Sequence, residues 1–244
     1  MKNKISIITV TKNSEKYLEK NILSVHKQMY KNYEHIIIDG KSTDNTLNII
    51  NKHKKKIKYC ISEKDRGLYD AMNKGIKKSS GDIIGILNSD DIYYNETLEI
   101  VNKYFNKYKK LDFLFGSVFK HRLLYGYYPQ KIKWSFGFYS THSIGFFIKK
   151  EAQKKVGYYN IKYKYSADYD LFYRLVVKKK MNGMATKKSE VFGKFRRGGL
   201  SSRIRFIDFL KECTQIRLDN KQNFFIVYLI FFARLLRNFK KILI

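Results

Sequence analysis

Residues 82–91 have the sequence DIIGILNSDD, an apolar run of strand length that ends in two adjacent carboxylates. A short apolar run bounded by polar turn residues is typical of a buried strand. Residues 82–87 are therefore predicted to form a strand, with Asp90 and Asp91 directly beyond its carboxyl end. The sequence that precedes this run repeats the same arrangement three times.

Strand-length apolar runs alternate with longer amphipathic stretches through the first half of the chain. This alternation is the signature of a parallel sheet built from βαβ units, so the sequence predicts an α/β fold. Asp44 and Asn95 are expected to cap two of the helices. The expected strands are residues 4–10, 33–38, 57–61 and 82–87, and the expected helices are residues 14–28, 43–54, 68–78 and 95–108.

All four predicted strands end in polar residues. Open α/β sheets bind ligands in the crevice beyond the carboxyl ends of their strands. Any one of these exits is equally well explained as an ordinary turn or helix cap, but four acidic or hydroxyl-bearing exits together favour a ligand site. The exits are Thr9-Val10-Thr11, Asp39-Gly40, Glu63-Lys64-Asp65-Arg66 and Asn88-Ser89-Asp90-Asp91.

Asp90 and Asp91 carry the strongest chemical signal. Two adjacent carboxylates at a strand end present the hard oxygen ligands that suit Mg²⁺ or Mn²⁺. Such ions commonly bind through one or two carboxylates together with substrate phosphates, so the pair indicates a phosphate-bearing ligand. The sequence contains no Walker-type loop, and no Gly-x-Gly-x-x-Gly follows the first strand, which disfavours P-loop NTPases and dinucleotide-dependent dehydrogenases.

The charge of the chain is strongly positive. Its 244 residues include 50 Lys and Arg against 21 Asp and Glu, a formal net charge of +29. This balance favours a polyanionic partner such as nucleic acid, an anionic membrane or a phosphorylated ligand. An AT-rich genome explains a composition rich in Lys, Asn, Ile, Tyr and Phe equally well. Because the lysines are scattered and no recognition motif accompanies them, nucleic acid is not the expected partner.

The two cysteines and the N-terminus bear on the compartment. Cys60 and Cys213 lie far apart and form neither a disulfide framework nor a metal-ligand spacing. Residues 1–4 lead straight into the first predicted strand, without the apolar segment of a secretory signal. A reducing, cytoplasmic environment is therefore expected.

Four segments of the first half carry a resemblance to a known family. They are IITVTKNS at 7–14, IIIDGKSTD at 36–44, SEKDRGLYDAMNKG at 62–75 and NSDD at 88–91. Together they resemble the inverting glycosyltransferases of family 2, which have the GT-A fold. The second resembles the uracil-contacting turn of that family, and the fourth its variant Asp-x-Asp motif.

The resemblance implies roles for individual residues. Asp91 would bind the metal, Mn²⁺ or Mg²⁺. Arg66 would clamp the pyrophosphate, although an arginine at this turn could also simply be solvated. The residues implied in nucleotide-sugar binding are Thr9, Thr11, Asn13, Asp39, Asp65, Arg66, Asn73 and Asp90.

Three later segments continue the resemblance to about residue 202. THSIGFF at 141–147 is similar to an acceptor-side strand, SADYDL at 166–171 to the catalytic-base motif, and GGLS at 198–201 to a loop that closes over the site. The resemblance implies Asp168 as the general base, although Asp168 could instead only cap a helix over 169–180. Ala167 replaces the usual preceding acid, and Asp170 is expected to be structural.

His142 is expected either as a metal ligand or as a buried structural histidine. On the acceptor side, the resemblance implies Phe146 and Phe147 together with Gly198 and Gly199.

The implied fold is a GT-A, Rossmann-like mixed sheet flanked by helices, followed by C-terminal amphipathic helices. Residues 1–202 would form the catalytic domain, with a nucleotide-sugar half at 1–105 and an acceptor half at 106–202, and 203–244 would form a basic, apolar tail. The implied activity is inverting, metal-dependent transfer of a sugar, expected from a UDP-sugar, to a lipid-linked oligosaccharide of a bacterial surface polysaccharide such as lipopolysaccharide O-antigen or capsule. A basic nucleic-acid-binding protein and a non-catalytic, nucleotide-sugar-binding partner subunit remain the alternatives.

The tail has two predicted helices, at 204–218 and 224–242. Residues 224–233 are apolar on every face but too few to span a bilayer. Arg234, Arg237 and Lys241 are then expected on one helical face, which suits an interfacial anchor on the anionic inner face of the cytoplasmic membrane. Packing of this helix on the catalytic domain and a dimer contact are the alternatives.

Overall fold

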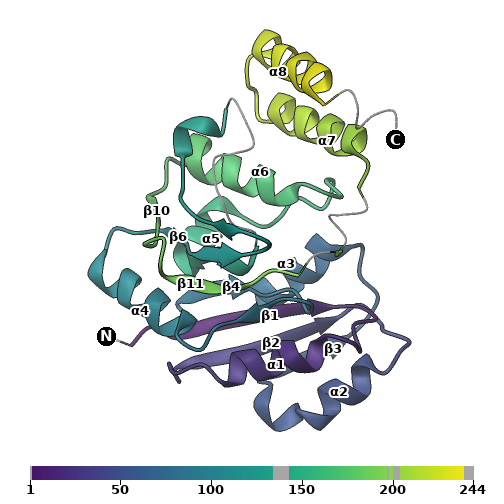
Figure 1. Ribbon diagram of the computed structural model, residues 1–244, viewed down its shortest axis with the longest axis vertical. Coiled ribbons are helices and arrows are strands. Elements are labelled where there is room, and N and C mark those ends of the chain that lie inside the picture. The colour runs from purple at the N-terminus through teal and green to yellow at the C-terminus, as the bar shows by residue number, and fades with distance from the viewer. Residues whose placement is uncertain (1, 134–142, 197, 200–203, 239–244) are drawn as a thin grey trace.

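The computed structural model describes residues 2–133, 143–196, 198–199 and 204–238. Within these residues a seven-stranded sheet has the order β10-β6-β9-β4-β1-β2-β3, and a four-stranded sheet has the order β5-β11-β7-β8 (Figure 1). The strands are β1 Ile5–Thr11, β2 Tyr33–Asp39, β3 Tyr59–Ser62, β4 Ile83–Ile86, β5 Ile92–Tyr93, β6 Phe113–Phe115, β7 Ser117–Phe119, β8 Leu123–Leu124, β9 Phe146–Lys149, β10 Gly183–Ala185 and β11 Val191–Lys194.

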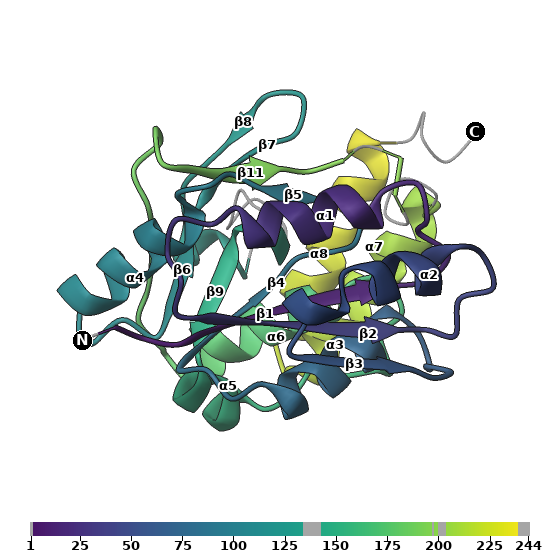
Figure 2. The ribbon, with the colours of Figure 1, turned by 90° about the horizontal axis from the view of Figure 1, so that it is seen from below.

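Helices cover both faces of the larger sheet (Figure 2). The α-helices are α1 Leu18–His26, α2 Thr46–Lys52, α3 Leu68–Lys78, α4 Thr97–Lys107, α5 Lys150–Val156, α6 Ala167–Tyr173, α7 Phe206–Asp219 and α8 Phe224–Arg237. A π-helical turn, Arg174–Lys178, follows α6. The expectation of an α/β fold with a mixed sheet flanked by helices is confirmed.

The alternation of buried side chains along the central strands explains the two helical layers. Ile8 and Ile38 lie in one core cluster with side chains of α3 and α6, whereas Ile7 and Ile37 lie in clusters with side chains of α1, α2 and α4. Successive strand residues point to opposite faces, so a strand buried on both sides is apolar throughout. Every residue of β1 is accordingly buried.

The first four strands run parallel, with β1 between β2 and β4. Strand β9 is antiparallel to both β4 and β6, which makes the sheet mixed. Phe146 and Phe147 on β9 are buried and contact aromatic rings on its two faces, Phe172 on one and Phe192 on the other. They therefore form the core of the acceptor half and present no surface to an acceptor.

Helix boundaries follow local hydrogen bonds. Helix α1 begins at Leu18, four residues later than expected, because the carbonyl of Ser14 first accepts the N–H groups of Tyr17 and Leu18 in a turn. Asp44 accepts the N–H of Thr46, the first residue of α2, at 3.0 Å, but the capping position of α2 is Asn45 rather than Asp44. The prediction of Asn95 as a cap is wrong, since Glu96 is the capping position of α4 and makes no side-chain cap bond.

The C-terminal helices stack on the acceptor half, with α8 outermost (Figure 1). Helix α7 contributes Cys213 and Ile216 to the same core cluster as α6, and α8 packs on α7. The first predicted tail helix is therefore integral to the core. Among the described residues, no helix is both long and apolar enough to cross a membrane.

Candidate active site

Hydrogen bonds join the exits of β1 and β2. Thr11 lies opposite Asp39 in the parallel register. Beyond them, the side-chain amide oxygen of Asn13 accepts the Thr43 N–H at 2.8 Å, and the Asn13 N–H donates to the Ser42 hydroxyl at 2.8 Å. Asn13 holds this position with a φ of +49°, which asparagine tolerates better than most residues. The hydroxyl of Thr11 is buried and has no hydrogen-bond partner among the described residues.

Asp39 organises the exits of β2 and β3. Its carboxylate accepts the hydroxyl and the N–H of Ser42, at 2.5 and 3.0 Å, and the hydroxyl of Ser62 at 2.5 Å. The residue is 0% exposed. The carboxylate is thus fully occupied in fixing two turns, and its contact with a nucleotide base stays a prediction.

Asp65 and Arg66 form the turn that leads into α3. Asp65 accepts the N–H of Gly67 at 2.9 Å, and its other oxygen lies so close to Gly40 that a Cβ there would stand 2.3 Å from it. The Arg66 side chain is 76% exposed and reaches Asp70 only at 3.7 Å. The turn therefore presents a solvated guanidinium beside the exit of β2, where an anionic ligand could recruit it.

Two predicted nucleotide-binding residues do not reach this edge. The Thr9 hydroxyl is fully buried against Asn21 and His35, at 3.1 and 2.9 Å. The side-chain amide of Asn73 is paired with the backbone of Tyr159 through bonds of 2.8 and 2.9 Å. Both side chains are structural, because strand alternation turns Thr9 toward α1 and the helical phase turns Asn73 toward the acceptor half.

Asp90 and Asp91 lie directly beyond β4, as predicted, but in different environments. Asp91 is 0% exposed, and its one bonded oxygen accepts the N–H of Arg196 at 2.9 Å. The other carboxylate oxygen of Asp91 has no partner among the described residues. Burial, reinforced by the neighbouring Asp90 carboxylate, raises the pKa of Asp91 to about 8. An unpartnered, buried carboxylate of this kind requires either a proton or a cation.

Asp90 is the solvent-accessible member of the pair. Its carboxylate accepts the Arg196 guanidinium at 3.1 Å, and that guanidinium also stacks on the Tyr17 ring with its carbon 4.0 Å from the ring centre. Gly199 comes so near that a Cβ would lie 3.1 Å from the Asp90 carboxylate. Gly199 therefore lies next to Asp90, and the acceptor-side role of Gly198 and Gly199 stays a prediction.

Sequence reasoning missed two residues that hold this pair in place. The side-chain amide of Asn21 donates to the carbonyls of Asn88 and Asp91, at 2.8 and 2.9 Å. Arg196 contacts both aspartates. Asn21 could have been found as the polar residue on the otherwise apolar face of α1 beside Leu18 and Ile22, whereas the contacts of Arg196 join segments too distant in sequence to be read from a pattern.

Asp168 lies in the first turn of α6, half-buried. Its carboxylate accepts the N–H of Tyr169 at 2.8 Å and the Tyr69 hydroxyl at 3.4 Å. Tyr69 is on the first turn of α3, and its hydroxyl also lies 3.1 Å from the Tyr165 carbonyl, so it connects α3 to the start of α6. Asp170 instead bonds Arg174 at 2.9 Å and Asn220 at 2.9 Å, which agrees with the expected structural role.

The donor set fits a hard divalent cation to a limited extent. Asp91 supplies a buried carboxylate oxygen that accepts no hydrogen bond from the described residues, and Asp90 supplies a second carboxylate. Carboxylate oxygens are the ligands that Mg²⁺ and Mn²⁺ prefer. The described residues contain no group of three His, Cys, Asp or Glu side chains that could hold a metal. His142, predicted as a further metal ligand, lies outside the described residues.

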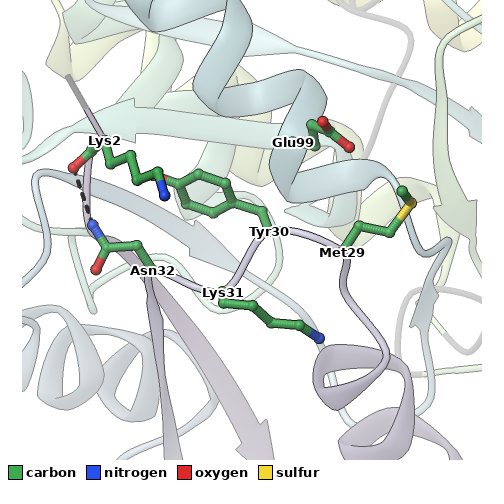
Figure 3. Close-up of a pocket in the computed structure, with 6 residues that line it drawn as sticks. All are labelled: Lys2, Met29, Tyr30, Lys31, Asn32 and Glu99. Atoms are coloured by element: carbon green, nitrogen blue, oxygen red, sulfur yellow. Dashed lines mark hydrogen bonds between the residues drawn. The ribbon is translucent and has the colours of Figure 1, made fainter.

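Two surface hollows lie away from these strand exits. One, of about 530 Å³, is lined by Lys2, Met29, Tyr30, Lys31, Asn32 and Glu99 (Figure 3). The other is lined by residues 51–56. Residues 30–32 lead into β2, so the first hollow is at the opposite end of the sheet from the carboxylates and does not belong to the site.

A mixed sheet whose parallel strands end in a joined set of acidic and hydroxyl groups, with a carboxylate pair beyond β4, has the architecture of the GT-A fold. Residues 6–166, more than half of the chain, match Glycosyl transferase family 2. The chain therefore belongs to this family.

Several relatives among curated proteins are named as glycosyltransferases. An uncharacterized glycosyltransferase of Haemophilus influenzae is 42% identical over 98 residues, which cover 39% of this chain and 39% of the relative. A PGL/p-HBAD biosynthesis glycosyltransferase of Mycobacterium bovis is 26% identical over 224 residues, 85% of this chain and 82% of the relative. The first relatives are thus matched over about two fifths of their length or less.

Solved structures with low sequence identity share the fold. Residues 1–349 of S. aureus TarS in complex with UDP-GlcNAc superpose with a TM-score of 0.71 at 20% identity, over 88% of this chain and 66% of TarS. The mannosyltransferase PcManGT of Pyrobaculum calidifontis, in complex with GDP-Man and Mn²⁺, superposes with a TM-score of 0.69 at 16% identity. The match covers 91% of this chain and 65% of the PcManGT chain.

Proposed function

We propose that this chain is a glycosyltransferase that takes a sugar from a UDP-sugar and transfers it, with inversion at the anomeric carbon, to a lipid-linked saccharide of a bacterial surface polysaccharide. The observation that carries the proposal is the buried Asp91 oxygen that lacks a partner, beside Asp90 at the exit of β4. A carboxylate held in this way at the ligand edge of an α/β sheet fits the metal–diphosphate end of a nucleotide-sugar.

The donor would lie along the joined strand exits. Thr11, Asn13 and the turn fixed by Asp39 would receive the nucleoside, and the exposed Arg66 guanidinium would contact the diphosphate. Asp91 and Asp90 would hold Mn²⁺ or Mg²⁺, which when bound neutralises charge on the departing diphosphate. The neighbours crystallised with UDP-GlcNAc and with GDP-Man and Mn²⁺ support a donor of this class.

Asp168 would act as the general base. Its carboxylate accepts the proton of an acceptor hydroxyl while the hydroxyl oxygen forms a bond to the anomeric carbon of the sugar and the bond to the diphosphate breaks. The Tyr69 hydroxyl, 3.4 Å from Asp168, is placed to orient that carboxylate from the donor half. Attack from the side opposite the leaving group would give inversion.

A lipid-linked acceptor is supported by the C-terminal end of the molecule. Helix α8 exposes large apolar side chains, and α8 packs on α7, which packs on the helix that carries Asp168. The M. bovis relative that covers most of the chain is named for PGL/p-HBAD biosynthesis.

A donor-hydrolysis screen tests the proposal. The purified chain is incubated with UDP-, GDP-, dTDP- and CMP-linked sugars in Mn²⁺ and in EDTA, and the released nucleotide is measured. We expect slow release from one UDP-sugar that requires Mn²⁺ and is lost in Asp91→Asn. Binding of none of these donors by calorimetry, with or without Mn²⁺, would contradict the proposal.

A further inference from the structure

Helix α8 has two apolar faces, and among the residues that the structure describes only one of them is covered. Val227 and Ile230 are 0% and 6% exposed and face α7. On the opposite side, Phe225, Leu229, Phe232 and Leu236 are 71%, 67%, 56% and 74% exposed. Their spacings of four, three and four residues place them in one row along the helix, here named the outer α8 row.

The outer α8 row is a feature that the packing of this chain does not explain. Single exposed apolar residues are common on protein surfaces, but a contiguous row of large ones marks an interaction surface. Phe224 and Tyr228 extend the row and are 53% and 46% exposed. A surface of this kind needs an apolar medium or an apolar partner.

The charge of the surrounding sequence distinguishes between two possible partners of the outer α8 row, a second copy of this chain and an anionic phospholipid surface. Residues 220–244 contain no Asp or Glu and five basic residues, Lys221, Arg234, Arg237, Lys240 and Lys241. A second copy of this chain would bring the same formal net charge of +29 against the same face. An anionic phospholipid surface offers both an apolar layer and the opposite charge.

Arg234 is an exception to the basic face expected from the sequence. It is half-buried on the packed side of α8, in line with Val227 and Ile230, and burial lowers its pKa to about 10. Arg237 and Lys221 are exposed near the two ends of α8, and Lys241 lies outside the described residues. The exposed positive charge therefore lies at the ends of the outer α8 row.

We propose that the outer α8 row docks on an anionic phospholipid surface, with α8 lying in the membrane interface. Its 14 residues fit an interfacial helix and are too few to span a bilayer. Glu212 on α7 accepts the backbone N–H groups of Lys164 and Tyr165, at 2.5 and 2.8 Å, just before the helix of Asp168. The docked helix pair would hold the acceptor half at the membrane, which deepens the proposed function and rests on it for the nature of the acceptor.

Vesicle co-sedimentation tests the docking directly. The full chain is compared with Phe225→Gln/Leu229→Gln/Phe232→Gln, which changes no charge and only exposed positions. A matched control, Met29→Gln/Tyr94→Gln/Tyr158→Gln, removes three exposed apolar side chains elsewhere, which are 57%, 42% and 47% exposed. Vesicles of phosphatidylcholine, with and without phosphatidylglycerol, are used at about 0.5 M salt, where the Debye length is about 4 Å and diffuse attraction is screened.

We expect the wild type and the control to sediment with the anionic vesicles and the α8 variant to sediment at least about 10-fold less. Circular dichroism and thermal melting establish that the α8 variant is folded. Equal sedimentation of the α8 variant and the wild type would overturn the proposal. A wild-type dimer by light scattering that becomes a monomer in the α8 variant, without a difference in vesicle binding, would assign the row to a second copy.

The test is independent of the chemistry at the strand exits. Vesicle binding requires no donor, so vesicle binding with no nucleotide-sugar binding would leave the docking surface and overturn only the proposed function. Donor binding by an α8 variant that still sediments with vesicles like the wild type would leave the proposed function and overturn only the docking surface.

Discussion

The strand exits and helix α8 differ in where their unusual side chains lie: charged groups are buried at the exits, whereas large apolar groups are exposed on α8. At the exits, charged groups are buried and held by several donors, as Asp39 is by Ser42 and Ser62. On α8, apolar groups are left in water, and Leu236 is 74% exposed. The side chains at the strand exits are therefore held mainly by hydrogen bonds within the chain. The exposed apolar side of α8 would instead be covered by an apolar phase outside the chain.

Substitution of the proposed base, Asp168 on α6, should have the largest effect on activity. Asp168→Asn keeps the size of the side chain but cannot accept a proton, so we expect sugar transfer to fall by about 10²- to 10⁴-fold with donor affinity unchanged. Calorimetry with UDP and a transfer assay measure the two quantities separately.

Asp170→Asn is the matched control for this substitution. Asp170 bonds Arg174 and Asn220 and is buried, so its loss should lower the melting temperature and leave turnover per folded molecule nearly unchanged. Near-normal transfer by Asp168→Asn would show that Asp168 only caps α6.

Asp91→Asn should separate metal-dependent from metal-independent binding. The substitution removes the buried oxygen that lacks a partner, so we expect the Mn²⁺-dependent part of UDP affinity to fall by at least about 10-fold, whereas binding in EDTA is unchanged. Asp82→Asn, at the other end of the same strand, is the control and should leave both affinities as they are. Equal Mn²⁺ dependence in wild type and Asp91→Asn would remove Asp91 from the metal site.

The sequence predicted the donor half well because local patterns determine it. Apolar runs located β1, β2 and β4 to within one residue of each end, and α3 was predicted at its observed bounds. The carboxylate pair was found because it follows an apolar run directly. Features carried by neighbours in sequence are thus accessible to sequence reasoning.

Features that depend on contacts between distant segments were not predicted. Thr9 and Asn73 were placed at the ligand edge because their segments lie there, but strand and helix phase direct their side chains inward. Arg196 reaches Asp90 across more than a hundred residues of sequence. Residues 224–233 of α8 are apolar on all sides in the sequence, and only the packing of Val227 and Ile230 shows which side remains exposed.

Acid should destabilise the donor half through His35. This histidine on β2 is 1% exposed, its ring lies 2.9 Å from the Thr9 hydroxyl of the neighbouring strand, and burial lowers its pKa to about 3. The unfolded chain, with an ordinary histidine pKa near 6.5, binds the proton more readily, so stability is full above about pH 6.5 and falls as the pH decreases toward 3. We expect a loss of about 2 kcal/mol between pH 7 and pH 5 from this residue.

Urea unfolding at several pH values measures this loss. His26, whose pKa burial lowers to about 4, contributes in the same direction, so the comparison is made between wild type and His35→Gln. The variant should show a shallower decline in the free energy of unfolding below pH 6.5. Parallel pH profiles for the two proteins would show that His35 does not titrate as proposed.

The smallest expected effect lies on the outer side of α8. Leu229→Ala removes a side chain that is 67% exposed, so the free energy of unfolding should change by no more than about 0.5 kcal/mol. Ile230→Ala, one residue further on the packed side, should cost about 2 kcal/mol because it opens a cavity against α7. Urea unfolding without lipid makes the comparison, and a cost for Leu229→Ala as large as that for Ile230→Ala would mean that the protein itself covers the outer row in solution. A neutral Leu229→Ala that also loses vesicle binding would instead show that the side chain is retained for a surface outside the chain.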